Sequence, residues 1–460
     1  MNLSSRYDNE NDLAVLSPPS VTGKSENSTF TVEVVTDIRK FDSLAAEWDE
    51  LAKQSDVHIF QLYFWLRTWW KHFGPKAKLH IVLIRQDETL IGIAPLYIEN
   101  YSFLSLSNFR YLRLIGSTIP HKGIRISFYK YGISDYLDFI VHPDKEEVVT
   151  DILIDHLQGP DCQYDRAFLQ DAPFDSFIMR KLTPALEHRK WNIVKEVGDK
   201  CPYAKLPKTN EDYLMSLDRK TRYKLRHSDR AVNEKHLFYI CNQSSAEQVS
   251  GTLRNLINLH QKRWNKRGEL GAFADPRYGP FVLDICEKAA RSNKLWMYTA
   301  YDGSQCIAVD CSFAFNGRIY DYLKSFDVNH PLAKYRPGMA IQYEIIKRAI
   351  RSGELVVDLL RGGERYKLKL TNSINSNWNV SFEKPSGISP FKRSYHSVDN
   401  FLFTYNQAFK RFLYLFRSGL KKQKKNHIRY LWDFSRFIIQ KLISRLFSRT
   451  EKELHNGNTG

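Results

Sequence analysis

The run RPGMA (336–340) is the part of the sequence best suited to bind an anion. A predicted strand ends at Phe326-Asp327, a loop follows, and this run then begins a predicted helix. Glycine lets a ligand approach the backbone, proline suits a first helical turn, and a helix N-terminus offers unpaired N–H groups. The run therefore predicts a pyrophosphate site, such as one for coenzyme A, although an ordinary helix start gives the same pattern. Its residues would be Arg336, Gly338, Met339 and Ala340.

Three further groups of polar residues could contact an anionic or sugar substrate. An arginine recurs every four residues along one predicted helix, an aromatic side chain lies among basic residues, and a predicted loop places an acid and a lysine after a double glycine. The candidates are Arg222 and Arg226, then Trp264 and Arg267, then Glu364 and Lys367. A solvated helix face, a core tryptophan and a solvated loop lysine explain the same patterns structurally.

Two halves of the chain repeat one another. KLHIVLIRQDETLIGIA (78–94) aligns without a gap on KLWMYTAYDGSQCIAVD (294–310), and each run predicts two strands around a polar turn. Matching helices are predicted before them, at Tyr63–Phe73 and Phe281–Ser292, and matching strands after them, at 136–140 and 356–360. The shared order predicts duplicated α/β units, with two unrelated hairpins as the alternative.

The predicted fold class is therefore α/β with mixed sheets. We expect a leader at 1–28, a first domain at 29–202, a second at 203–385 and a basic helical tail at 386–460. A connector between Cys201 and Asn210 would separate the two domains.

Charge and cysteine content restrict the class of protein. The net charge is +17, and the tail alone holds 15 Lys and Arg against four acidic residues. The six cysteines show neither CxxC spacing nor a neighbouring His, so the sequence predicts reduced cysteines and no metal site. With no signal peptide and no apolar run of about 20 residues, we expect a cytoplasmic protein.

The run from Tyr320 to Leu370 resembles the GNAT-type acetyltransferase domain of the CelD-like family of cellulose biosynthesis, which is related to the FemAB-like fold. The matching motifs are Phe326-Asp327, Pro337-Gly338, Asp358, Gly363-Glu364 and Tyr366-Lys367. Weaker similarity extends over roughly 31–383. The resemblance implies two tandem GNAT-like domains that transfer an acyl group from acetyl-CoA, or another acyl-CoA, to a saccharide or cell-envelope precursor.

Acyl transfer requires a base, an oxyanion stabiliser and often an acid. Asp310 lies within a predicted strand, and Asp327 lies where a strand meets the proposed phosphate loop, so either could be the base. Tyr322 could donate a proton. Inert strand acids, a turn-capping aspartate and core packing of the tyrosine are the alternatives.

Two other functions remain open. RPG replaces the glycine-rich phosphate loop usual in GNAT proteins, so a FemAB-like use of aminoacyl-tRNA is possible, as is a non-catalytic partner of a membrane polysaccharide synthase. In the tail, apolar residues recur at helical spacing from Leu431 to Leu446 opposite basic ones. This pattern favours an anionic membrane surface over nucleic acid, with a packed helical extension as the structural alternative.

Overall fold

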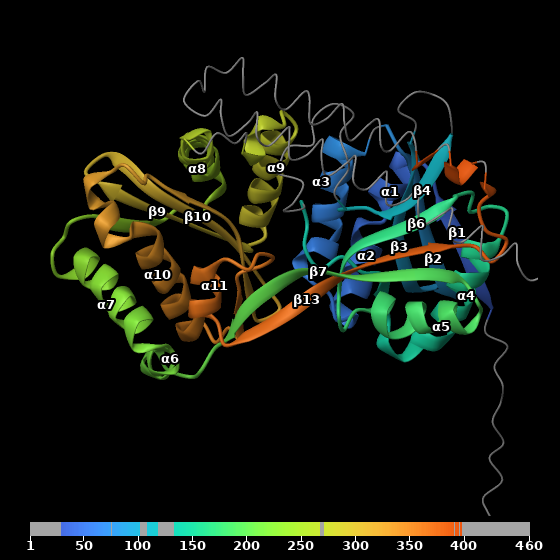
Figure 1. The fold of residues 1–460 in the computed structure, drawn as a ribbon, viewed down its shortest axis with the longest axis horizontal. Coiled ribbons are helices and arrows are strands. Elements are labelled where there is room, and N and C mark those ends of the chain that lie inside the picture. Colours follow the sequence, from blue (N-terminus) through green and yellow to red (C-terminus); the bar gives the residue numbers. More distant parts are fainter. Residues whose placement is uncertain are drawn as a thin grey trace, which may run out of the picture.

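A computed structural model describes residues 29–74, 76–101, 108–117, 133–266, 271–390, 392–394 and 396–397. Arg267 and nearly all of the predicted tail lie outside these residues. Within them the chain forms one mixed sheet, with helices on both faces (Figure 1). No helix of the described part is long and apolar enough to cross a membrane.

The sheet contains thirteen strands. They are β1 (Phe30–Val35), β2 (Lys78–Gln86), β3 (Thr89–Tyr101), β4 (Phe109–Leu114), β5 (Ile140–Val141), β6 (Arg166–Pro173), β7 (Asn192–Lys205), β8 (Tyr239–Asn242), β9 (Leu295–Asp302), β10 (Gln305–Phe315), β11 (Arg318–Phe326), β12 (Val356–Asp358) and β13 (Ser373–Glu383). Their spatial order is β1-β2-β3-β4-β6-β13-β7-β12-β11-β10-β9-β8, and β5 pairs with β3.

The strand order is the same in the two halves when each is followed inward from its edge. In the first half β1 to β4 are antiparallel neighbours and β6 then pairs parallel with β4. In the second half β8 to β11 follow the same pattern, and β12 pairs parallel with β11. Between them, β13 pairs with β6, and β7 pairs with β12. The last strand of each half therefore completes the sheet of the other half.

The α-helices are distributed over both halves. They are α1 (Ile38–Ser43), α2 (Ala45–Gln54), α3 (Tyr63–Phe73), α4 (Glu146–Gln158), α5 (Thr183–His188), α6 (Asn210–Ser216), α7 (Arg219–Asn233), α8 (Ala246–Lys266), α9 (Tyr278–Arg291), α10 (Pro337–Arg351) and α11 (Arg365–Leu370). In the second half, α8 contacts β10 and β11, and α10 contacts β9, β10 and β11 together with α7.

One hydrophobic core crosses the boundary between the halves. Trp65 of α3 is fully buried, and its indole ring lies edge-on to Phe281, Phe313 and Tyr322 of the second half, at centroid distances of 5.9, 5.4 and 5.3 Å. Edge-to-face contacts of this kind add to the free energy gained by burial. The two halves are therefore packed together rather than tethered.

Local sequence explains the hairpins that form the centre of the second half. Asn316 and Gly317 join β10 to β11, and both have positive φ angles of 48° and 70°. A two-residue turn with this backbone favours Asn-Gly because it matches the twist of the paired strands. The turn aligns β10 with β11 and so places their polar residues opposite one another.

Two expectations about the repeat need correction. The strand predicted at 136–140 is not the counterpart of β12, since Tyr136 has a φ of 53° and only Ile140 joins the short strand β5. The counterpart is β6, which pairs parallel with its neighbour as β12 does. The connector predicted from Cys201 is also partly wrong, because β7 continues to Lys205. Pairing with β12 and β13 keeps this segment extended.

Candidate active site

A cavity of about 650 Å³ lies in the second half of the chain. Its walls come from β11, the start of α10, the segment that follows β12, and α11, while α8 and α9 contribute further side chains. Asp135 reaches the cavity from the first half. Both halves of the chain therefore form this site.

A bulge in β11 determines which side chains face the cavity. Cys311 is opposite Leu323 whereas Ser312 is opposite Asp321, so Tyr322 is an extra residue in β11. Bulges redirect side chains and are common beside active sites. Asp321, Tyr322 and Lys324 all line the cavity together with Asp310 of the neighbouring strand.

Asp310, Asp321 and Lys324 form a buried charged cluster. The Asp310 carboxylate accepts a hydrogen bond from the Ser312 hydroxyl at 2.7 Å, and its other oxygen has no protein partner. Lys324 forms an ion pair with Asp321 and also donates to Gln342. Among the described acidic residues, the Lys324 ammonium group pairs with Asp321 alone, which leaves Asp310 as the acid of this cluster without a direct cation.

The environment of Asp310 changes its acidity. Burial and the nearby Asp321 carboxylate raise the pKa of Asp310 to about 8. Burial would lower the pKa of Lys324, but the Asp321 carboxylate outweighs it, so the pKa is raised and the lysine stays charged. A carboxyl group with such a pKa can accept and return a proton near neutral pH.

The predicted anion site forms part of the same cavity. Arg336 caps α10 with a left-handed φ of 55°, Pro337 occupies its first turn, and both Gly338 and Met339 line the cavity with Arg336. A Cβ atom on Gly338 would meet the Phe326 ring at 3.6 Å, an ordinary contact distance, and no other part of the described chain within 4 Å. The prediction that Ala340 belongs to this site needs correction. Ala340 is buried in the core and does not line the cavity.

Glu364 and Lys367 also line the cavity, but not as a solvated loop. Lys367 belongs to α11 and is buried. Its ammonium group donates to the backbone oxygen of Arg361 at 2.6 Å and lies 3.5 Å from the Glu364 carboxylate. Lys367 therefore holds the backbone of the turn that follows β12 in place.

Asp327 is a predicted site residue that lies outside the cavity. Its carboxylate pairs with Lys262 at 2.7 Å and accepts the Asn329 backbone N–H at 2.9 Å, and it does not line the cavity. These contacts lower its pKa although burial opposes them. The turn-capping interpretation therefore fits Asp327 better than the role of a base.

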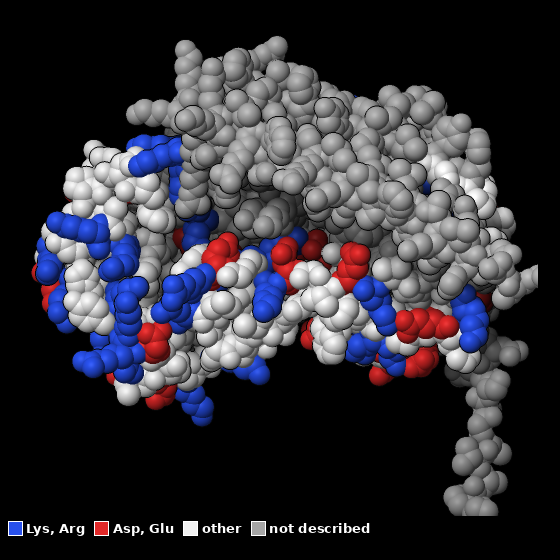
Figure 2. Space-filling model, viewed as in Figure 1, with Lys and Arg blue, Asp and Glu red and all other residues white. Residues whose placement is uncertain are grey.

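The remaining predicted residues separate into two groups. Trp264 and Tyr322 line the cavity, and the Tyr322 hydroxyl donates to the Ile133 carbonyl at 2.8 Å. Arg222 and Arg226 lie on α7 away from it, and Arg226 pairs with Glu211 at 2.8 Å. Figure 2 shows Lys and Arg gathered where Figure 1 places α7. The structure thus supports a solvated basic face for this helix.

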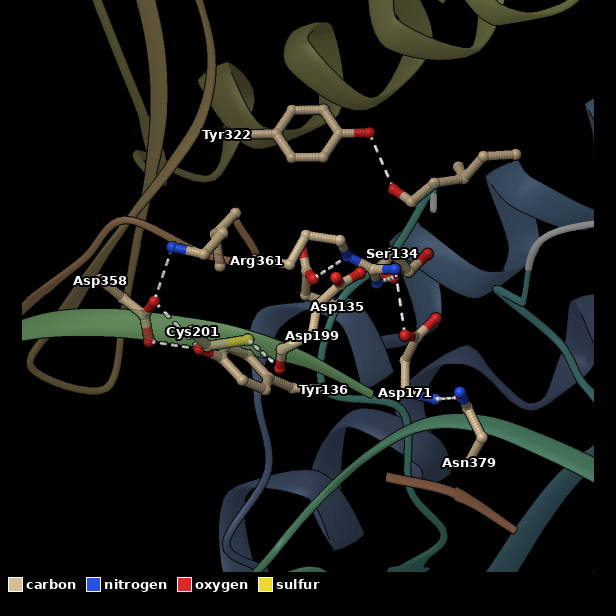
Figure 3. Close-up of polar contacts among 12 residues, drawn as sticks. Ser134, Asp135, Tyr136, Asp171, Asp199, Cys201, Tyr322, Asp358, Arg361 and Asn379 are labelled. Carbon is tan, nitrogen blue, oxygen red and sulfur yellow. Dashed lines mark hydrogen bonds and ion pairs between the residues drawn. The ribbon is translucent and has the colours of Figure 1, made fainter. Parts of the chain in front are cut away.

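A buried polar network joins the cavity to the first half (Figure 3). Arg361 forms ion pairs with Asp135 and, at 3.0 Å, with Asp171, and both aspartates come from the first half. The Tyr136 hydroxyl donates to the Asp358 carboxylate at 3.0 Å. The sequence reasoning missed this network because its members are far apart in the chain.

The missed cavity residues Asp321 and Lys324 had a weak signal in the sequence. They lie in YDYLKSF, a strand otherwise rich in aromatic residues, where charged side chains are unusual unless they are paired. The bulge that brings both into the cavity has no evident signature in the sequence. The cavity is also distinct from the His/Cys group of the described residues, which lies in the first half.

Comparison with known proteins identifies the class of this site. Residues 219–368 match the family model described as the acetyltransferase (GNAT) domain. This match covers about a third of the chain and includes most of the cavity walls, so this part of the chain is similar to GNAT-type acetyltransferase domains. No curated protein matches the chain.

Solved structures support the same fold. The crystal structure of FemX matches with a TM-score of 0.55 at 11% identity, covering 80% of this chain and all of that one. L-PGS from Bacillus licheniformis matches at 10% identity with a TM-score of 0.43, over 79% of this chain and 96% of that one. A tandem GNAT protein of the clavulanic acid pathway matches at 9% identity with a TM-score of 0.42, over 78% and 99%. The mixed sheet and the likeness to FemX confirm the predicted mixed α/β fold, whereas the CelD-like family remains a prediction.

Proposed function

We propose that the cavity transfers an acyl group from acyl-CoA to an amine or hydroxyl group. The observation that carries the proposal is that one cavity joins the start of α10 to a desolvated carboxyl group, Asp310. The first feature suits a pyrophosphate and the second suits proton transfer. The GNAT match supports acyl-CoA as the donor.

Each group would have a separate task. Arg336 and the N–H groups around Gly338 and Met339 would bind the donor pyrophosphate. Ionised Asp310 would take the proton of the attacking nitrogen or oxygen while the new bond to the acyl carbon forms. The C–S bond then breaks and the thiolate leaves. Lys324 would hold Asp321 ionised beside Asp310.

Tyr322 fits a different role from the proton donor suggested by the sequence. Burial raises the pKa of its hydroxyl well above the ordinary value, and the proton is engaged with the Ile133 carbonyl. Both effects make Tyr322 a poor acid. We therefore propose that it shapes the wall of the acceptor pocket.

The acceptor would be a saccharide or a cell-envelope precursor, as the CelD-like resemblance implies. Trp264 supports a ring-shaped acceptor because its indole lines the cavity beside Arg263. Association with an anionic membrane surface through residues 386–460 belongs to the same proposal.

Titration calorimetry with acetyl-CoA tests the donor, and release of free thiol in the presence of amino sugars tests the reaction. We expect one binding site per chain and thiol release that requires an acceptor. Asp310→Asn should keep donor affinity and lose turnover. If the wild-type protein binds no acyl-CoA, the proposed donor is wrong, and the non-catalytic alternative gains support.

Aminoacyl-tRNA is the second candidate donor, favoured by the basic face of α7. Binding to a phosphate backbone should weaken steeply with salt, whereas acetyl-CoA binding should change little. Substituting Arg222 and Arg226 together should weaken tRNA binding and leave acetyl-CoA binding intact. Activity that requires charged tRNA and ignores acyl-CoA would replace the first candidate.

A further inference from the structure

Two histidines and a cysteine meet in the first half, away from the cavity. His80 comes from β2, His156 from the last turn of α4, and Cys162 from the turn that follows α4. Their ligand atoms all lie within 4.8 Å of one another, and the two imidazole Nε2 atoms are 3.1 Å apart. We propose that these three side chains bind a zinc ion.

The geometry suits a four-coordinate divalent metal. Zinc bonds of about 2.0–2.3 Å at tetrahedral angles place neighbouring ligand atoms about 3.3–3.8 Å apart. The Nε2 atoms, 3.1 Å apart, are already close to this separation, and the thiol requires a shift of at most about 1.3 Å. Because His, His and Cys are zinc ligands of ordinary type, the donor set fits zinc better than calcium or magnesium.

The surroundings favour ligation over an unrelated hydrogen bond. The three side chains are shielded from solvent, since His80 and Cys162 are buried and His156 is half-buried. Zinc binds cysteine as the thiolate, so binding would release the Cys162 thiol proton. Hydrogen bonds among the three side chains are the alternative to a bound zinc ion, and the experiment below separates these two arrangements.

Charged neighbours leave room for a fourth ligand. Asp161 is exposed and adjoins Cys162 in the sequence. Lys384 donates to the Cys162 carbonyl at 2.9 Å, so its ammonium group is tied to the backbone of the turn. Asp161 or a water molecule would therefore complete the tetrahedron.

The proposed role of this zinc site is structural. It would join the end of α4 and the turn before β6 to β2, and none of the three ligands lines the cavity. The sequence analysis predicted no metal site because the cysteines show neither CxxC spacing nor a neighbouring His. The zinc proposal departs from that prediction, because the fold brings His80 of β2 close to His156 and Cys162.

Cobalt substitution in the full chain tests the site. After treatment with a chelator, Co²⁺ should give a thiolate charge-transfer band and the intense visible bands of four-coordinate cobalt, and Zn²⁺ should displace both at one equivalent. Cys162→Ser should lose the thiolate band and bind zinc at least about 100-fold more weakly. Cys241→Ser is the matched control, since Cys241 is a half-buried cysteine outside the group.

A second variant protects the test against a folding defect. His156→Ala removes the less buried histidine, and it should also lose the tetrahedral spectrum while circular dichroism stays unchanged. Zinc should raise the melting temperature of the wild type and of Cys241→Ser. It should not raise that of Cys162→Ser or His156→Ala. Equal zinc affinity in Cys162→Ser and Cys241→Ser, or no binding by the wild type, would overturn the proposal. Acyl transfer should be independent of zinc, so failure of either proposal leaves the other testable.

Discussion

Arg361→Ala tests whether the buried network holds the two halves together. Arg361 and its partners Asp135 and Asp171 each have side chains only 7–8% exposed. Loss of the guanidinium group would leave two desolvated carboxylates facing each other. Removing one partner of a buried pair typically costs about 3–5 kcal/mol. We expect a loss of this size in the free energy of unfolding at pH 7.

Arg189→Ala is the matched control for this substitution. Arg189 also pairs with two aspartates, Asp151 and Asp155, at 2.7 and 2.6 Å, but both aspartates are about 70% exposed. Surface pairs of this kind contribute at most about 1 kcal/mol. Arg361 also donates to the Ser134 backbone carbonyl, so its variant loses one further hydrogen bond, and burial is the other main difference between the two variants.

Urea unfolding followed by tryptophan fluorescence and by far-UV circular dichroism measures both variants. Arg361→Lys should lie between wild type and Arg361→Ala, because an ammonium group keeps the charge but cannot reach three acceptors in one plane. The loss in Arg361→Ala should shrink at low pH as the stranded carboxylates take up protons. A loss below about 1 kcal/mol, equal to that of Arg189→Ala, would refute the inference that this network stabilises the junction.

Four further outcomes are expected. Gly338→Val should weaken acetyl-CoA binding at least about tenfold in calorimetry without changing the melting temperature, because a Val side chain would occupy the donor approach; Gly251→Val, in a helix with no neighbour within 4 Å, should bind normally. Asp310→Asn should lower kcat by about 10²-fold or more and abolish the rise of kcat/KM through about pH 8. Since the pKa of Asp310 is raised on folding, its contribution to stability is present below about pH 4 and is lost as pH rises through 8, so urea unfolding of the variant should depend less on pH, by up to about 1.4 kcal/mol per unit. Asp327→Asn should cost about 1 kcal/mol of stability and leave the pH–rate profile unchanged. A chain ending at Lys392 should lose co-sedimentation with anionic vesicles. Equal binding by the truncated chain and the full chain would contradict the tail as the anchor.

Local patterns in the sequence predicted the second half well. The strands around Asp302-Gly303 and the helix after Pro337 lie where expected, because alternation and helix-start signals act over a few residues. The prediction of a strand at 136–140 was wrong, because an apolar run of this length also suits a buried irregular segment. Tertiary contacts decided its conformation.

The candidate site could be predicted only in part. Arg336 and Gly338 carry a local signal, and the structure brings them into the cavity with Asp310. Asp321 enters because of a bulge, and Asp135 enters because the two halves pack together. Both effects depend on pairing between distant segments, which a single sequence does not specify.

The exchange of β7 and β13 between the halves delays part of the sheet's assembly while the chain is being synthesised. β6 ends at Pro173, but its neighbour β13 begins only at Ser373, about 200 residues later. At about 5–20 residues per second, the edge of β6 stays unpaired for about 10–40 s during elongation. An unpaired edge can recruit other chains. A fragment that stops after the first half keeps this edge permanently, so we expect it to aggregate even though its own strands are complete.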